Sequence, residues 1–244
     1  MFPIRAIALI TTLSLLAAAG LLWAADPKPP ASNTPDSMNE YQYQMALYSF
    51  LSNDYLASAS MSEDILEKSP YDKANILLRL SDSKLLYKRK YPEFDSPSLF
   101  LETAMVTELL DSYYRLREYE DIFGIGKPLA DSTAARYFEG MGLLGKNRLG
   151  EAYMSLSRVP AGDPFYLYAG IALAQIDVMR QNYEEAEKRL NGLISLTDAQ
   201  TPYINEKARI LLAQLLFEKG LYAEALNQFM NIRDSSRLYR EALA

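Results

Sequence analysis

The sequence predicts an all-α protein built from repeated pairs of helices, and three observations carry this prediction. From about Asn39 onward, apolar residues recur at steps of three and four, and no segment shows the sustained alternation that is typical of a β-strand. A spacing of small and large side chains recurs in the second half of the chain. Helix breakers separate stretches long enough for helix pairs, and they lie at Ser69-Pro70, Tyr91-Pro92, Pro128, Pro160 to Pro164 and Thr201-Pro202.

Residues 1–25 have the layout of a secretory signal peptide. Arg5 precedes an apolar run that extends to Trp23, and a pair of alanines follows it. The alternative is an uncleaved membrane anchor, because residues 6–25 are about enough to span a bilayer. The chain has neither a cysteine, which excludes a bacterial lipoprotein anchor, nor a glycosylation sequon. We therefore expect a bacterial periplasmic protein or, alternatively, one anchored in the inner membrane and facing the periplasm.

Three further segments follow this N-terminal run. Residues 26–38 carry four prolines and no periodic apolar pattern, which is typical of an extended, flexible linker. Helical repeats are expected over residues 39–232. The last segment, 233–244, is expected to form an amphipathic helix that either caps the array or begins a further unit.

The composition argues against several classes of function. The formal net charge is −6 and the pI is near 4.9, so nucleic acid is a poor candidate partner. The chain has no cysteine and no histidine, which removes the commonest nucleophile-base pairs and the commonest metal ligands. We therefore predict a protein that is not an enzyme and that needs no cofactor and no metal.

The repeated spacing is seen in three segments. In each, a small residue is followed twelve positions later by an alanine; the pairs are Gly140 and Ala152, Ala174 and Ala186, and Ala213 and Ala225. A large apolar residue lies three positions before each alanine and another four positions after it; these are Leu149 and Leu156, Tyr183 and Leu190, and Tyr222 and Phe229. Small residues let two helix backbones approach closely, and the large ones fill the groove around them.

This pattern resembles the tetratricopeptide repeat, a helix-turn-helix unit of about 34 residues, and here the exported, periplasmic bacterial members of that family. The resemblance implies a right-handed α-solenoid. Two degenerate units are expected where the twelve-residue spacing returns, at Ala46 and Ser58 and at Leu110 and Ile122. The tyrosines at the groove-filling position are expected in the core; they are Tyr55, Tyr119, Tyr183 and Tyr222. A generic helical bundle with a coincidental spacing is the alternative.

The resemblance also implies where a partner would bind, because the first helix of each unit faces a concave groove in this family. The residues expected to line that groove are Tyr114, Arg115, Tyr137, Met141, Leu144, Tyr168, Ile171, Gln175, Met179, Ile210, Gln214 and Phe217, with Thr107, Asp111 and Lys207 beside them. This surface is rich in tyrosine and methionine, which are favoured at protein interfaces. It lacks the clustered lysines and asparagines with which some relatives hold a terminal carboxylate. We expect it to bind a helix or an extended segment.

Two local motifs are candidates for other chemistry. Ser81 and Lys84 form an SxxK pair, but the partner motifs SDN and KTG are missing, which favours a surface helix. The basic run of Lys84, Lys88, Arg89 and Lys90 is expected to be a solvated helix end. Its alternative role is contact with an acidic partner or with lipid head groups.

The sequence therefore favours a scaffold or adaptor that binds other proteins in the bacterial cell envelope. The alternative within the same class is an accessory component of outer-membrane assembly or polysaccharide-export machinery, where similar repeat proteins occur. An enzyme, such as a helical envelope hydrolase, is the alternative from another class. Possible membrane association would come from residues 6–25.

Overall fold

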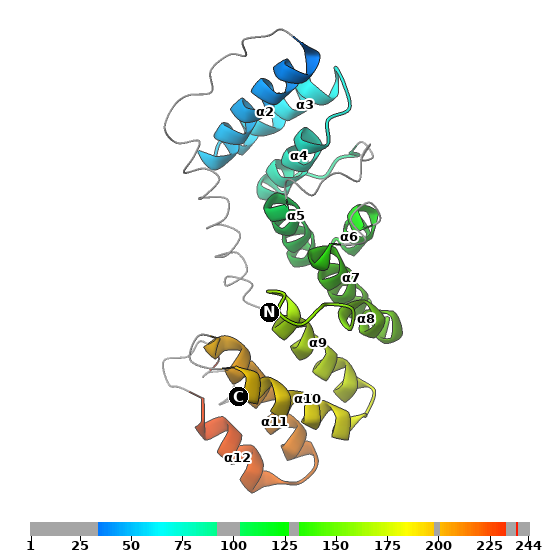
Figure 1. The fold of residues 1–244 in the computed structure, drawn as a ribbon, viewed down its shortest axis with the longest axis vertical. Coiled ribbons are helices and arrows are strands. Elements are labelled where there is room, and N and C mark those ends of the chain that lie inside the picture. The colour runs from blue at the N-terminus through cyan, green and yellow to red at the C-terminus, as the bar shows by residue number, and fades with distance from the viewer. Residues whose placement is uncertain (1–33, 92–102, 127–131, 198–200, 233–237, 239–244) are drawn as a thin grey trace. The chain divides into compact units, whose positions relative to one another are not determined.

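The structure is a computed structural model that describes residues 34–91, 103–126, 132–197, 201–232 and Leu238. These residues form eleven helices and no strand, which confirms the all-α prediction (Figure 1). The helices are α2 Pro35–Leu51, α3 Tyr55–Leu66, α4 Asp72–Leu85, α5 Thr103–Leu116, α6 Tyr119–Gly126, α7 Thr133–Gly145, α8 Leu149–Leu156, α9 Tyr166–Met179, α10 Tyr183–Leu196, α11 Pro202–Glu218 and α12 Tyr222–Met230.

Five pairs of consecutive helices are joined by the same turn. The pairs are α2–α3, α5–α6, α7–α8, α9–α10 and α11–α12, and we call their members the first and the second helix. In each turn one residue adopts a left-handed conformation two positions before the second helix; these residues are Asn53, Arg117, Asn147, Gln181 and Gly220. The next N–H donates to the carbonyl five residues earlier at 2.8–2.9 Å, which satisfies the end of the first helix. A common turn is what a repeated unit requires.

The start of α2 corrects the expected linker boundary. The helix begins at Pro35 and not after residue 38. The side-chain oxygen of Thr34 accepts a hydrogen bond from the Ser37 N–H, and proline is favourable in the first helical turn because its missing N–H would have no partner there. A proline that looks like a linker residue in the sequence therefore starts a helix. Residues 1–25, and 26–33 of the linker, lie outside the described residues.

The small residues of the repeated spacing are buried, as predicted. Ala174 and Ala213 are fully buried, and Gly140 is buried against α8. A Cβ atom added to Gly140 would lie 2.5 Å from Cγ of Leu156, the large residue that the spacing places in the groove. Ala46, Ser58, Leu110 and Ile122 of the two degenerate units are also fully buried. The spacing therefore identifies helix contacts in both the regular and the degenerate units.

The four tyrosines expected in the core do not lie there. Tyr55, Tyr119 and Tyr183 are only half-buried, and Tyr222 is 62% exposed. Each begins a second helix, and the rings of Tyr55, Tyr119 and Tyr222 contact an aromatic ring near the end of the preceding first helix. The rings of Tyr222 and Phe217, for example, lie 5.1 Å apart in an edge-to-face contact. The prediction of core positions was wrong because the first residue of a helix has no preceding turn to cover it.

The chain divides into two compact units, Met1–Phe138 and Glu139–Ala244, which we call unit 1 and unit 2. In unit 1, α3 packs against α2 and α4, and α5 packs against α4 and α6. The helix α4 ends at Leu85, because Leu86 adopts a left-handed conformation.

In unit 2, α8 packs against α9, α10 lies against α9 and α11, and α11 also contacts α9 and α12. Successive helices therefore pack against their neighbours in both units. Of the predicted capping segment 233–244, only Leu238 is described, and it packs with Ile210 and Ile232. No helix in the described part of the chain is both long and apolar enough to cross a membrane.

Candidate functional site

The candidate binding site is a groove of about 350 Å³ in unit 2, where the ends of α7, α9 and α11 meet. Four residues predicted from the sequence line it: Leu144, Gln175, Met179 and Gln214. The remaining lining residues were not predicted; they are Ala174, Val178, Leu211, Leu215 and Glu218. Each lies one, three or four positions from a predicted residue on the same helix. A prediction that took a wider face of each first helix would therefore have included them.

The walls of this groove are mostly aliphatic, and its polar groups are few. Gln175 and Gln214 occupy the same position of two successive pairs, six residues before the left-handed residue of each turn. Glu218 contributes the one charged side chain of the lining. Apolar walls with a small number of fixed polar groups are typical of sites that bind an apolar side chain and orient it. Carboxamides can both donate to and accept from a peptide backbone.

Four of the predicted site residues are core residues instead. Tyr137, Met141, Ile171 and Ile210 are each no more than 2% exposed. Ile171 and Gln175 lie one turn apart on the same face of α9, yet only Gln175 reaches the groove. On α11, Ile210 is likewise covered, because it packs with Ile232 and Leu238. These four side chains stabilise the fold and cannot contact a partner.

Two predicted aromatic residues of unit 2 lie outside the groove lining. Phe217 is 60% exposed near the end of α11, where it packs against Tyr222. Tyr168 is half-buried on α9, and burial raises the pKa of its hydroxyl. Lys207 is half-buried on α11. Of these, only Phe217 offers a large exposed apolar surface.

The predicted residues of α5 belong to unit 1. Tyr114 is half-buried between the rings of Tyr119 and Phe138, at 6.2 and 6.4 Å, and burial raises its pKa to about 12. Arg115 is exposed and pairs with Asp111 at 2.5 Å. Asp111 and Thr107 are buried, contrary to prediction. Arg115 is therefore the predicted residue of α5 that remains accessible.

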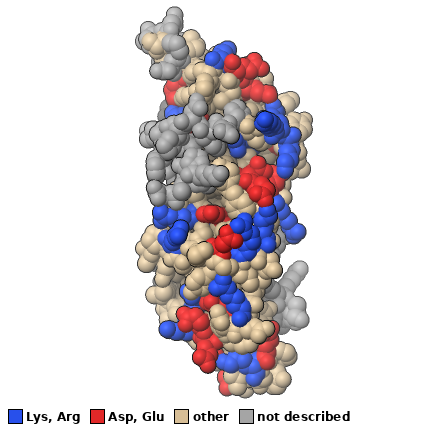
Figure 2. Space-filling view, turned by 90° about the vertical axis from the view of Figure 1, so that its right-hand side faces the viewer, with Lys and Arg blue, Asp and Glu red and all other residues tan. Residues whose placement is uncertain are grey.

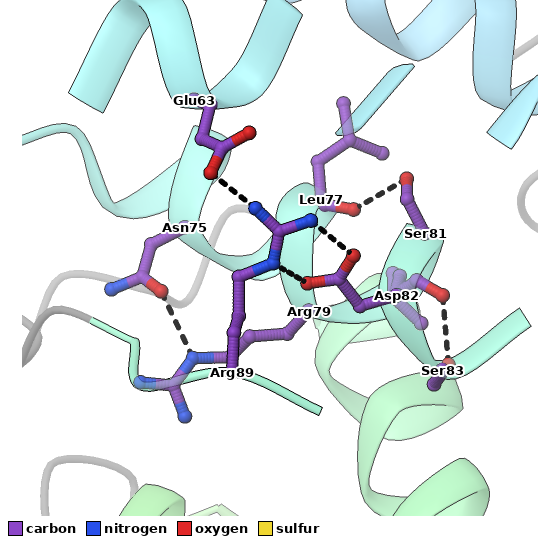
Figure 3. Close-up of polar contacts among 9 residues, drawn as sticks. Glu63, Asn75, Leu77, Arg79, Ser81, Asp82, Ser83 and Arg89 are labelled. Atoms are coloured by element: carbon purple, nitrogen blue, oxygen red, sulfur yellow. Dashed lines mark hydrogen bonds and ion pairs between the residues drawn. The ribbon is translucent and has the colours of Figure 1, made fainter. Parts of the chain in front are cut away.

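Unit 1 also holds a cluster of buried polar side chains along α4 (Figure 3). The Asp82 carboxylate is fully buried; its Oδ1 accepts a hydrogen bond from Nη2 of Arg89 at 3.0 Å, and its Oδ2 lies 2.7 Å from Nε of the same arginine in an ion pair. Arg89 also pairs with Glu63 of α3. Arg79 donates to Asn75 one turn earlier at 2.9 Å. The two ion pairs of Arg89 hold the segment after α4 against α3 and α4.

The carboxyl groups of this region show how burial acts on charge. Burial raises the pKa of Asp82 above its ordinary value, although Arg89 opposes the change. Burial likewise raises the pKa values of Asp111 and Asp121. Burial would also raise the pKa of Glu40, but hydrogen bonds, the largest from Tyr71, outweigh it and lower that pKa.

The basic run is in part the solvated helix end that the sequence predicts, because Lys84 is exposed in the last turn of α4 and Lys88 is 71% exposed. Lys84 pairs with Glu108 at 2.8 Å, Lys88 pairs with Glu118 at 3.1 Å, and Arg89 is held by Asp82. Arg89 departs from that prediction, because the chain turns at Leu86 and the Arg89 side chain pairs with the buried Asp82.

The serine of the SxxK pair is also engaged within the fold. Ser81 is buried in the middle of α4, and its hydroxyl donates to the Leu77 carbonyl at 2.8 Å and contacts the Ser58 hydroxyl at 3.0 Å. The expected surface helix is therefore a buried one. Among the described residues, no group of three or more acidic side chains gathers as a metal site would require.

Unit 2 holds a smaller polar contact of the same kind. Arg189 of α10 donates to the buried Asp177 at 2.9 Å and to the Tyr153 hydroxyl at 3.1 Å. On the face of the molecule seen in Figure 2, acidic and basic side chains are interspersed among uncharged ones.

Comparisons of the chain with protein-family models, with curated proteins and with solved structures gave no match. What the structure itself defines is an all-helical protein of stacked helix pairs.

Proposed function

We propose that this protein is a scaffold or adaptor of the bacterial cell envelope that binds a helical or extended segment of another protein. On this proposal the helix pairs form a right-handed solenoid of the tetratricopeptide type, exported through residues 1–25. The observation that carries the proposal is the groove between α7, α9 and α11, because four residues expected at a partner site lie around it.

The lining of the groove supports a segment with a projecting apolar side chain. Leu144, Val178, Met179, Leu211 and Leu215 provide the walls, and a volume of about 350 Å³ accommodates a large aliphatic or aromatic group. Gln175 and Gln214 lie on adjacent helices and can hydrogen-bond to the backbone of the segment. Glu218 favours a basic residue at one end and disfavours an acidic one.

The proposal can be tested by photo-crosslinking in envelope preparations. A photoreactive amino acid is placed at Gln214 in the groove and, as a control, at Met154, which is exposed on α8 and does not line the groove. We expect a specific crosslinked partner from position 214 alone. The crosslinked segment is then synthesised as a peptide, and its Kd for the protein is measured.

Two methionines allow a matched comparison in the same assay. Met179 lines the groove and is 53% exposed, whereas Met154 is 55% exposed and lies elsewhere. Met179→Glu should weaken binding of the peptide by about tenfold or more, since it places a charge where an apolar side chain docks, and Met154→Glu should leave the Kd unchanged. Equal effects of the two substitutions, with helical circular dichroism intact in both, would show that the groove is not the binding site.

A further inference from the structure

The second helices of unit 2 are covered by the next first helix, and their contacts repeat in register. Tyr153, the fifth residue of α8, lies with its ring centre 5.3 Å from the Arg180 guanidinium. Glu187, the fifth residue of α10, pairs with Lys219 at 2.6 Å. Arg180 and Lys219 are equivalent, because each directly precedes the left-handed residue of its turn. The fifth residue of a second helix therefore marks the face that the next first helix covers.

On α12 this face is apolar and exposed. Its fifth residue is Leu226, which is 59% exposed, and Met230 one turn further is 76% exposed. Tyr222 lies one turn earlier on the same stripe and is also exposed. Leu238 packs elsewhere, with Ile210 and Ile232. We call Tyr222, Leu226 and Met230 the α12 stripe.

The matching face of a first helix can be identified on α11. Asn205 near its start donates to the carbonyl of Ile194 in α10 at 3.1 Å, and Lys219 at its end pairs with Glu187 of the same helix. The residues between them at helical steps of three and four share that face, and they are Ala208, Leu212 and Leu215. All three are buried.

The equivalent face of α2 is apolar but only partly covered. Counted from the left-handed residue of the turn, its residues are Met38, Tyr41, Met45 and Tyr48, which we call the α2 stripe. Tyr48 corresponds to the buried Leu215 and is 46% exposed, and Met38 is also exposed. Tyr41 and Met45 are half-buried. The α2 stripe thus has the position and the composition of a surface that packs on a second helix.

We infer that the α12 stripe of one copy of this chain binds the α2 stripe of a second copy. The contact would repeat, between molecules, the packing of α10 on α11 within unit 2. One side of the contact belongs to a second helix and the other to a first helix, so the interface joins two different surfaces. Such an interface leaves one free stripe of each kind, and further copies can add head to tail.

The charges on the two stripes favour a second copy as the occupant. The chain carries a net charge of −6, so two copies repel unless they meet through uncharged surfaces. Neither stripe contains a charged residue, whereas the equivalent junctions within unit 2 use Arg180 or Lys219. At the junction between copies the equivalent pair is Leu226 and Ser52, which are both uncharged. This inference does not depend on the proposed partner groove.

Cysteine crosslinking provides a direct test, because the chain contains no cysteine. Full-length Leu226→Cys and Tyr48→Cys variants are mixed and treated with a short bis-maleimide. We expect a crosslinked dimer from the mixture and none from either variant alone. A dimer formed by Leu226→Cys alone would show that α12 pairs with α12 of another copy, and no dimer from the mixture would show that the stripes do not meet. Both results would overturn the inference.

Charge substitutions test the same contact without crosslinking. Leu226→Glu and Tyr48→Glu should each weaken self-association in sedimentation velocity by about tenfold or more. A mixture of the two should still form a dimer, because each variant retains one intact stripe. Leu56→Glu is the matched control, since Leu56 is 63% exposed on α3 and lies on neither stripe. Self-association that survives both substitutions, or that Leu56→Glu also abolishes, would contradict the inference.

Discussion

In unit 2 each first helix is followed directly by its second helix. In unit 1 the helix α4 has no such second helix directly after it. After the left-handed Leu86, the described residues 87–91 form no helix. The N–H of Tyr87 nevertheless donates to the Asp82 carbonyl at 2.8 Å, which is the hydrogen bond found in all five turns. The helix α4 therefore ends in the same way as the first helices of the five pairs. It differs from them in what packs beside its end.

An aspartate shows how the difference is accommodated. Asp82 of α4 and Asp177 of α9 both lie four residues before the left-handed residue and are both buried. In unit 2 the cation comes from the second helix, as Arg189, and in unit 1 it comes from the segment after α4, as Arg89. A repeated position can thus keep its buried charge when the second helix is replaced, provided that another element supplies the arginine.

The largest effect is expected when the ion pair of Arg89 and Asp82 in unit 1 is broken. Arg89→Met should lower the free energy of unfolding by about 3 kcal/mol, because it leaves the buried Asp82 carboxylate without its cation. Arg189→Met should have an effect of similar size in unit 2. Urea unfolding followed by circular dichroism measures both.

The control for this comparison is Arg148→Met. Arg148 and Glu151 form an ion pair in which both side chains are half exposed, so the loss should stay within about 0.5 kcal/mol. A loss from Arg89→Met as small as that from Arg148→Met would show that the buried cluster does not stabilise unit 1.

The second prediction concerns two glycines of unit 2. Gly140→Ala should cost about 1–3 kcal/mol, because the added Cβ would lie 2.5 Å from Cγ of Leu156 and force it to move. Gly192→Ala on α10 should stabilise by about 0.5–1 kcal/mol, since nothing lies within 4 Å of its Cβ and alanine favours a helix. Thermal unfolding distinguishes the two, and destabilisation of equal size at both positions would contradict the assignment of Gly140 as the helix contact.

A smaller effect is expected at the shared turn. Gln181 adopts a φ of 63°, which is costly for a residue with a Cβ and natural for glycine. Gln181→Gly should therefore stabilise by about 0.5–1 kcal/mol and raise the thermal midpoint by roughly 2–4 °C. Asn147→Gly should gain less, because asparagine tolerates this conformation. A lower midpoint for Gln181→Gly would mean that the contacts of the Gln181 side chain stabilise the fold by more than its backbone conformation costs.

The smallest effect is a dependence on pH in unit 1. Because burial raises the pKa of Asp82 in the folded state, the folded protein binds a proton more readily than the unfolded chain. This carboxyl therefore adds stability as the pH falls from neutral toward its ordinary pKa near 4, and that contribution is lost as the pH rises. As the pH is lowered from 7 to 4, Asp82→Asn should become less stable relative to the unchanged protein, because only the unchanged protein gains stability from protonation of Asp82. A difference that stays constant with pH would contradict the raised pKa.

The sequence by itself determined the helices and the contacts between paired helices. The steps of three and four residues identify helical segments, and the twelve-residue spacing identifies Gly140, Ala174 and Ala213 as buried. Both properties depend on periodicity and side-chain size, which are local. The left-handed conformations of Gln181 and Arg117 had no such signal, because neither residue type favours that conformation and the surrounding turn imposes it.

The tertiary structure decided which residues of each face stay open. Ile171 and Gln175 share a face of α9 by periodicity, yet Ile171 is covered and Gln175 lines the groove. Likewise, nothing in the spacing indicates that Ser81 and Asp82 are buried. They are buried because helices pack on both sides of α4. Periodicity fixes the direction in which a side chain points. Its exposure depends on how far the neighbouring helices extend over it, and that is a property of packing between segments distant in the sequence.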